Sequence, residues 1–201
     1  MKKNQYFSIV KATEEHISLA AEICKAFEEA AKVRGTGIAK RTKEYVAKKM
    51  QEGKAIIAIS NRGKFAGFCY IETWEHGKYV ANSGLIVVPE FRELGLAKKI
   101  KEAVFRLSRE KYPNAKIFSI TTSPAVLKMN SDLGFRPVGF ADLTSDEEFW
   151  QGCQSCSNYD ILLRTQRKLC LCTGLLYNPE EKSKAKQEEK SNEKTKSRIS
   201  L

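Results

Sequence analysis

The sequence has no long hydrophobic run. Its apolar stretches, such as residues 55–59 and 85–88, span five residues or fewer, whereas a helix that crosses a bilayer needs roughly 20. The N-terminal segment has two lysines but lacks the apolar segment of a secretory signal. Hydrophobic residues make up 42% and charged residues 29% of the chain, which is ordinary for a globular domain. Membrane-spanning, collagen-like and wholly disordered proteins are therefore excluded, and we expect a cytoplasmic protein.

Acidic residues are scarce relative to basic ones. The chain has 24 Asp and Glu residues and 35 Lys and Arg residues, for a net charge of +11. Basic residues recur in a predicted helix at positions Lys98, Lys99, Lys101, Arg106, Arg109 and Lys111. This pattern favours a solvated helix face; a site for a polyanionic small molecule is the second interpretation, and nucleic-acid binding is the least favoured.

The order of predicted elements indicates one α/β domain with a mixed sheet covered by helices. Strands are expected at residues 6–11, 55–60, 64–73, 79–88, 116–121, 135–139 and 158–163, and helices after Thr13, at 42–51, 95–112 and 124–133. We expect the domain to cover residues 1–177, with a core at 6–163 and a cysteine-containing extension at 150–177. Residues 178–201 are rich in Lys, Glu and Ser, which predicts a disordered tail.

The most informative segment is a loop between a strand and a long helix. Arg92, Gly95 and Ala97 form an Arg-x-x-Gly-x-Ala pattern, and the helix starts directly after it. Unpaired N–H groups and the positive end of a helix dipole would meet there, beside small residues that let a phosphate approach. The pattern predicts an anion site; a glycine that merely caps the helix is the alternative.

Residues 85–99 resemble the acetyl-CoA-binding motif of the GCN5-related N-acetyltransferase (GNAT) superfamily. Residues 123–135, which end in Leu-Gly-Phe, resemble a later helix of the same family. The resemblance implies the GNAT fold, a central mixed sheet flanked by helices. It also implies an acyl-CoA-dependent N-acetyltransferase, in which an amine attacks acetyl-CoA directly in a ternary complex.

The resemblance also assigns residues to acetyl-CoA. Backbone N–H groups of Leu85, Ile86 and Val87 would lie along the pantetheine and the thioester carbonyl. The pyrophosphate would contact the loop residues Arg92, Glu93, Leu94, Gly95, Leu96 and Ala97. Lys98, with Lys99, would add positive charge, and Ser123 would lie near the pantetheine or only cap its helix.

The catalytic groups that the family often uses are absent. Ala81 stands where many members have a glutamate base, so Glu72, Glu75 and His76 are the nearest candidates, and Ser83 could orient a water. Asn130 stands where many members have a tyrosine that protonates the leaving thiolate. An amide can only donate a hydrogen bond there.

The acceptor amine is predicted from a shorter resemblance. Residues 120–122 and 134–138 are similar to the acetyltransferase domain of N-acetylglutamate synthases. This similarity implies a small amino acid such as glutamate, with Arg34, Arg41 and Arg136 as partners of its carboxylates. A protein amine, another small amine, and a non-catalytic module that binds CoA or nucleic acid are alternatives. A homodimer is left open.

Six cysteines in a cytoplasmic chain suggest reduced thiols or a metal rather than disulfides. Cys24 and Cys69 occupy apolar positions. The other four form Cys153-x-x-Cys156 and Cys170-x-Cys172, for which packing is the favoured interpretation and a zinc site or a redox pair the alternatives. We also expect Phe149 and Trp150 to cover the acceptor side of the cleft.

Overall fold

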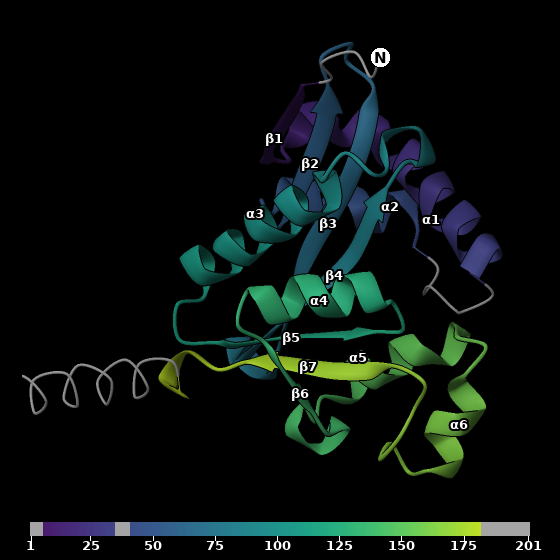
Figure 1. The fold of residues 1–201 in the computed structure, drawn as a ribbon, viewed down its shortest axis with the longest axis vertical. Coiled ribbons are helices and arrows are strands. Elements are labelled where there is room, and N and C mark those ends of the chain that lie inside the picture. The colour runs from purple at the N-terminus through teal and green to yellow at the C-terminus, as the bar shows by residue number, and fades with distance from the viewer. Residues whose placement is uncertain (1–5, 35–40, 182–201) are drawn as a thin grey trace, which may run out of the picture.

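A seven-stranded mixed sheet organises the chain, in the order β1-β2-β3-β4-β5-β7-β6. The structure is a computed structural model that describes residues 6–34 and 41–181. Its strands are β1 (Phe7–Lys11), β2 (Ala55–Ser60), β3 (Phe65–Trp74), β4 (Tyr79–Val87), β5 (Lys116–Thr121), β6 (Arg136–Val138) and β7 (Thr173–Tyr177). Figure 1 shows that β5 and β7 run at a steep angle to β2, β3 and β4. The mixed α/β fold predicted from the sequence is confirmed.

Two helices cover one face of the N-terminal half of the sheet (Figure 1). The chain passes through a short 3-10 helix (Glu14–Leu19) into α1 (Ala20–Arg34), and Thr13 and His16 form a capping box at its start. In α2 (Lys43–Gln51), the Thr42 hydroxyl accepts the N–H of Tyr45. Apolar residues at helical spacing, such as Ile23 and Met50, pack on the strands and are fully buried.

The opposite face carries α3 (Leu96–Lys111) and α4 (Pro124–Asp132). Ile100 and Val104 of α3 are fully buried against β3 and β4. The strand-helix-strand unit formed by β4, α3 and β5 gives a parallel pair, as its order predicts. None of the helices in the described ranges is long and apolar enough to cross a membrane.

Residues between β6 and β7 form a separate lobe below the sheet (Figure 1). It contains α5 (Glu147–Gln151), α6 (Tyr159–Arg164) and two short 3-10 helices at Phe140–Asp142 and Gly152–Ser155. Trp150 is its buried centre, with the indole N–H donating to the Thr144 carbonyl at 2.8 Å. Phe118 and Leu176 of the sheet belong to the same apolar cluster.

One prediction for the C-terminal part is wrong. The expected strand at 158–163 is the helix α6, in which Leu162 is buried and Leu163 is 64% exposed. In the apolar run 169–176 the strand begins only at Thr173, and the preceding Leu169 and Leu171 are each 63% exposed. Cys170 and Cys172 therefore precede the strand. Residues 182–201 of the predicted tail lie outside the described part of the chain.

Candidate active site

The strands β4 and β5 separate in the middle of the sheet. They pair in parallel only from Tyr79 opposite Lys116 to Ala81 opposite Phe118. Beyond this point β5 pairs with β7 on its other side, while β4 continues along β3. The edges of β4 and β5 that face each other thus have no strand partner in the part of the chain that the structure describes. A V-shaped opening follows, in which backbone groups can contact a ligand.

A β-bulge shapes β4 beside this opening. Ser83 pairs with Tyr70 and Ile86 with Phe68, so Gly84 and Leu85 stand opposite Cys69 alone. Gly84 has a φ of +65°, and a Cβ added there would lie 2.4 Å from Cε1 of the Tyr70 ring. Only glycine fits this backbone and this contact. The bulge turns the backbone of residues 84–85 away from regular pairing.

The loop before α3 has the features of an anion site. Pro89–Phe91 form one 3-10 turn, and the Nε of Arg92 donates to the Val87 carbonyl at 3.1 Å. Gly95 has a φ of +73°, and a Cβ added there would have no heavy atom within 4 Å. Among the described residues, none accepts a hydrogen bond from the backbone N–H groups of residues 93–98. These donors and the helix dipole are free to meet a phosphate.

A cavity of about 640 Å³ opens at the V. Its lining comes from β3 (residues 70–74), β4 (residues 81–85), β5 (residues 118–121), helices α1 to α4 and the lobe between β6 and β7. Phe149 of α5 lines it as expected, whereas Trp150 does not. Of the predicted catalytic and acceptor residues, Glu72, Ser83 and Arg41 line this cavity.

Arg41 supplies a cation on the α1 and α2 side of the cavity. Its guanidinium lies 4.6 Å from the centre of the Phe27 ring and 5.3 Å from that of Tyr70. Its Nε donates to the Tyr70 hydroxyl at 2.6 Å. These contacts hold the guanidinium in place, because the rings fix its plane and the hydroxyl fixes its direction.

Glu72 supplies a carboxylate on the same side. It stands directly opposite Ala81 across the β3–β4 pair, so it reaches the place where the sheet opens. Its Oε1 accepts the Tyr45 hydroxyl, and the Lys49 ammonium lies 3.9 Å away. Burial, with the neighbouring Tyr70 and Glu72, raises the pKa of Tyr45, so this phenol stays protonated and serves as a donor.

The remaining candidates lie elsewhere. Glu75 accepts from Thr144 Oγ1 and the Ser145 N–H, both at 2.8 Å, and these hydrogen bonds lower its pKa. Glu75 thereby ties the β3–β4 turn to the lobe. It does not line the cavity, and neither does its neighbour His76.

Asn130 and Ser123 belong to α4 and its cap. The Asn130 side chain is fully buried, and neither of its amide atoms has a partner among the described residues. The Ser123 hydroxyl accepts the Val126 N–H at 3.4 Å and caps the helix. Neither residue lines the cavity, although Thr122 and Val126 beside Ser123 do.

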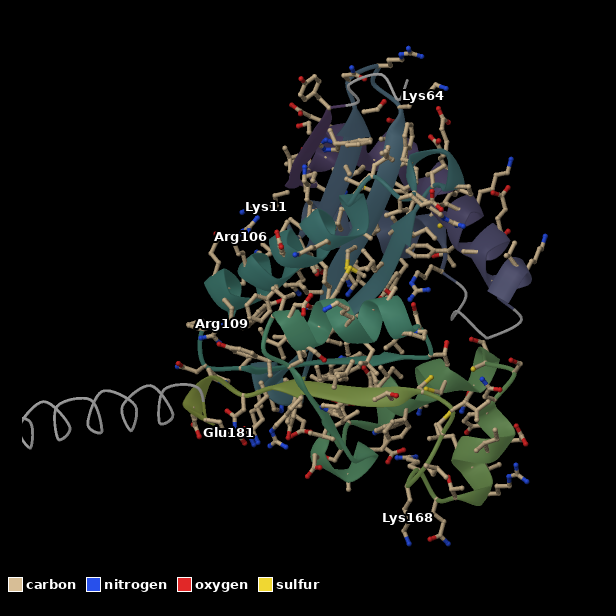
Figure 2. The ribbon with its side chains drawn as sticks, in the orientation of Figure 1. Lys11, Lys64, Arg106, Arg109, Lys168 and Glu181 are labelled. Atoms are coloured by element: carbon tan, nitrogen blue, oxygen red, sulfur yellow. The ribbon has the colours of Figure 1, made fainter. Side chains whose placement is uncertain are left out.

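Arg136, the second predicted acceptor arginine, does not line the cavity. Arg136 lies on the edge strand β6, where its guanidinium makes two hydrogen bonds, of 2.9 and 3.0 Å, to Glu181. Glu181 lies near the end of the described chain (Figure 2). Arg34 ends α1, and its side chain lies outside the described part of the structure.

The prediction of a solvated face is wrong for two cations of α3. Lys101 is 2% exposed and lines the cavity. Arg109 has a buried Nη1, and its guanidinium lies 5.6 Å from the Tyr177 ring centre. Lys101 is three residues before Val104 and one after Ile100, and this apolar helical spacing is the signal that could have placed it inside.

The four C-terminal cysteines all line the lobe side of the cavity. Cys153, Cys170 and Cys172 pack against the apolar cluster of Trp150 and Phe118. Burial, with the neighbouring thiols, raises the pKa of Cys153 to about 11 and that of Cys172 to about 12. Within the described ranges, no group of three or more His, Cys, Asp or Glu residues is arranged to hold a metal ion.

Comparison with known proteins agrees with this geometry. The model of the acetyltransferase (GNAT) family matches residues 23–135, which is more than half of the chain and includes α3, its loop and the opening of the sheet. No curated protein sequence matches the chain.

Solved structures of this family share the fold. N-acetylglutamate synthase from Neisseria gonorrhoeae, solved with coenzyme A and N-acetyl-glutamate, is 14% identical with a TM-score of 0.60; the match covers 86% of this chain but only 35% of the synthase chain. A GNAT acetyltransferase from Staphylococcus aureus is 16% identical with a TM-score of 0.60, over 87% of this chain and 99% of that one. Phosphinothricin acetyltransferase from Sinorhizobium meliloti, solved with AcCoA, is 13% identical with a TM-score of 0.58, over 86% and 88%. The chain belongs to the acetyltransferase (GNAT) family, and it is an acyl-CoA-dependent N-acetyltransferase.

Proposed function

We propose that this protein transfers the acetyl group of acetyl-CoA to the amine of a small amino acid, with glutamate as the favoured acceptor. The observation that supports this most is that Arg41 and Glu72 both line one cavity beside the opening of the sheet. An amino acid carries a carboxylate and an amine, and the cavity offers one group of opposite charge to each. The reaction would belong to amino-acid metabolism.

The donor half of the site is built from backbone. The free N–H groups of residues 93–98 suit the pyrophosphate of CoA, and Lys98 and Lys99 are exposed beside them. The β4 segment of Leu85, Ile86 and Val87 leads from that loop to the V. Backbone donors there would hold the oxyanion that forms on the thioester carbonyl, a contribution of about 3 kcal/mol for one donor.

The acceptor half of the site uses side chains. The Arg41 guanidinium, held by Phe27 and Tyr70, would bind a carboxylate of the acceptor through charge-assisted hydrogen bonds. An amino acid arrives mostly as an ammonium, which has no lone pair, so a proton must leave before attack. Glu72 is the carboxylate nearest to the opening in the β3–β4 register and would accept this proton directly or through a water held by Ser83.

The direct test is release of the CoA thiol from acetyl-CoA with a panel of amino acids. We expect release with glutamate to exceed release with glutamine and with a glutamate whose amine is already blocked, and mass spectrometry to find acetyl on the α-amine. Glu72→Gln should lower kcat by about 100-fold or more, whereas Glu75→Gln is the matched control outside the cavity. CoA binding without thiol release for any amine would refute the proposed reaction and favour a binding module.

A further inference from the structure

Lys101 is a buried cation at the opening of the sheet that the reaction described so far does not use. It comes from α3 and is 2% exposed, yet it lines the same cavity as Ser83 and Arg41. In the described part of the chain it has no carboxylate partner within ion-pair distance, unlike Lys49 and Lys54. An ammonium buried without a counter-ion is costly, so it is retained only where something offsets that cost.

The neighbours of Lys101 fix the position of its ammonium. The Nζ donates to Asn82 Oδ1 at 3.3 Å, the Asn82 Nδ2 donates to Ser108 Oγ at 2.7 Å, and the Ser108 hydroxyl donates to the Val104 carbonyl at 2.9 Å. This chain sets the orientation of the Asn82 amide, which must present its oxygen to Lys101. The Phe135 ring centre lies 5.5 Å from Nζ on the side of α4.

The place of this ammonium matters because Asn82 is the first β4 residue beyond the last pair with β5. Lys101 therefore lies where the two strands part, next to the bulge at Gly84 and Leu85. Asn82 is the one side-chain acceptor among the described residues for the three protons of Nζ. Protons of Nζ thus remain without a side-chain acceptor in the described chain, beside the opening where the proposed function puts the thioester.

The surroundings of Lys101 leave it able to give up a proton near neutral pH. Burial lowers its pKa to about 8. The titratable group that faces it is the Cys69 thiol of β3, and burial raises the pKa of Cys69 to about 11, so this thiol is uncharged at neutral pH. Asn82 of β4 and Phe135 after α4 are neutral. A thiol such as that of CoA has an ordinary pKa of about 8.5, close to that of Lys101.

We propose that the Lys101 ammonium is the acid that protonates the CoA sulfur as the thioester bond breaks. Lys101 can act in this way only if acetyl-CoA is the donor, as proposed above. A proton donor at position 130 is then not needed, because Lys101 of α3 supplies the proton that Asn130 of α4 cannot.

The proton balance of this step closes without another reagent. The free amine of the acceptor forms the C–N bond, and collapse of the tetrahedral intermediate breaks the C–S bond and leaves its electron pair on sulfur. A proton moves from Nζ to sulfur, which gives the CoA thiol and a neutral Lys101 amine. The nitrogen of the new amide loses one proton to solvent, and solvent returns one to Lys101.

The experiment measures the thiol of bound CoA, so it needs no acceptor. The pKa of this thiol is followed by the ultraviolet absorbance of its thiolate in the saturated complex, after subtraction of the spectrum of the same variant without CoA. The variants are Lys101→Met, Lys101→Gln and the control Arg106→Met, which removes an exposed cation from the outer side of α3 (Figure 2). Gln keeps a donor for Asn82, so it tests the charge alone if the Met variant fails to fold.

We expect the loss of Lys101 to reduce the thiolate fraction of bound CoA by about tenfold at pH 8, since an adjacent ammonium favours the thiolate. The thiolate fraction in Arg106→Met should equal that in the unmodified chain. An unchanged thiolate fraction in Lys101→Gln, with CoA still bound, would overturn the role of Lys101 and leave the proposed function standing. If calorimetry detects no CoA binding by the unmodified chain, the proposed function itself fails.

Discussion

Replacing Lys101 by Met should change how the stability of the protein depends on pH. Lys101 is fully buried, and its pKa falls from the ordinary 10.5 to about 8. Between these two values the unfolded chain holds a proton that the folded chain has released. The free energy of unfolding therefore rises with pH in this window, and the Met variant lacks this contribution.

The magnitude follows from the size of the pKa change. At about 1.36 kcal/mol per unit, the drop from 10.5 to about 8 corresponds to roughly 3 kcal/mol of destabilisation while Lys101 is charged in both states. This penalty is fully present below about pH 8 and disappears above about pH 10.5. Between pH 7 and pH 9, linkage therefore raises the free energy of unfolding of the unmodified chain by about 1 kcal/mol relative to that of the Met variant.

Urea denaturation at pH 7, 8 and 9 measures this gain. At each pH, the free energy of unfolding of the Met variant is subtracted from that of the unmodified chain, and this difference is compared between pH values. The Met variant also leaves Asn82 Oδ1 without its donor, but that cost is constant with pH and cancels. Arg106→Met, an equal loss of charge on the exposed side of α3, should follow the unmodified chain in parallel. Parallel curves for Lys101→Met as well would show that the buried amine does not titrate as described.

Three further substitutions test the site. Gly84→Ala should lower the free energy of unfolding in urea denaturation by about 2 kcal/mol, because its Cβ would meet the Tyr70 ring at 2.4 Å. The control Gly63→Ala is also at positive φ but has open space around it, so it should lower this free energy clearly less. Gly95→Val should weaken CoA binding at least tenfold in calorimetry, and the chain should stay folded although the φ of +73° strains the new side chain and lowers the melting temperature. Unchanged affinity would remove the phosphate site from this loop. Arg41→Leu should raise the KM for the acceptor by about 10-fold or more with no change in CoA affinity, whereas Arg136→Leu should leave both unaltered; equal effects of the two would refute the acceptor site.

The sequence predicts best what local signals determine. The helical segment after Thr13, the helix predicted at 42–51 and the glycine before α3 depend on neighbours in the chain, and each lies where the sequence predicts it. The superfamily and its mixed sheet follow from such patterns taken in order.

The prediction is weaker where burial depends on distant partners. The residue pattern assigns Lys101 to solvent because lysine is rarely fully buried, and its acceptor Asn82 is 19 residues away on another element. The apolar run 169–176 gives no sign that Leu171 faces outward while Leu175 enters the sheet. Which of Arg41 and Arg136 reaches the cavity depends on the strand order, which the residue pattern alone does not determine.

The lobe between β6 and β7 begins and ends on adjacent strands. Val138 pairs with Gly174 in an antiparallel register, so the lobe leaves the sheet and returns to it at one place. A longer or different lobe would therefore cost little loop-closure entropy. The loop before α3 and the end of β4 lie outside the lobe. The lobe side of the cavity, with Phe149 and the four cysteines, can therefore change in length or sequence while Arg41, Glu72 and the loop before α3 keep their positions.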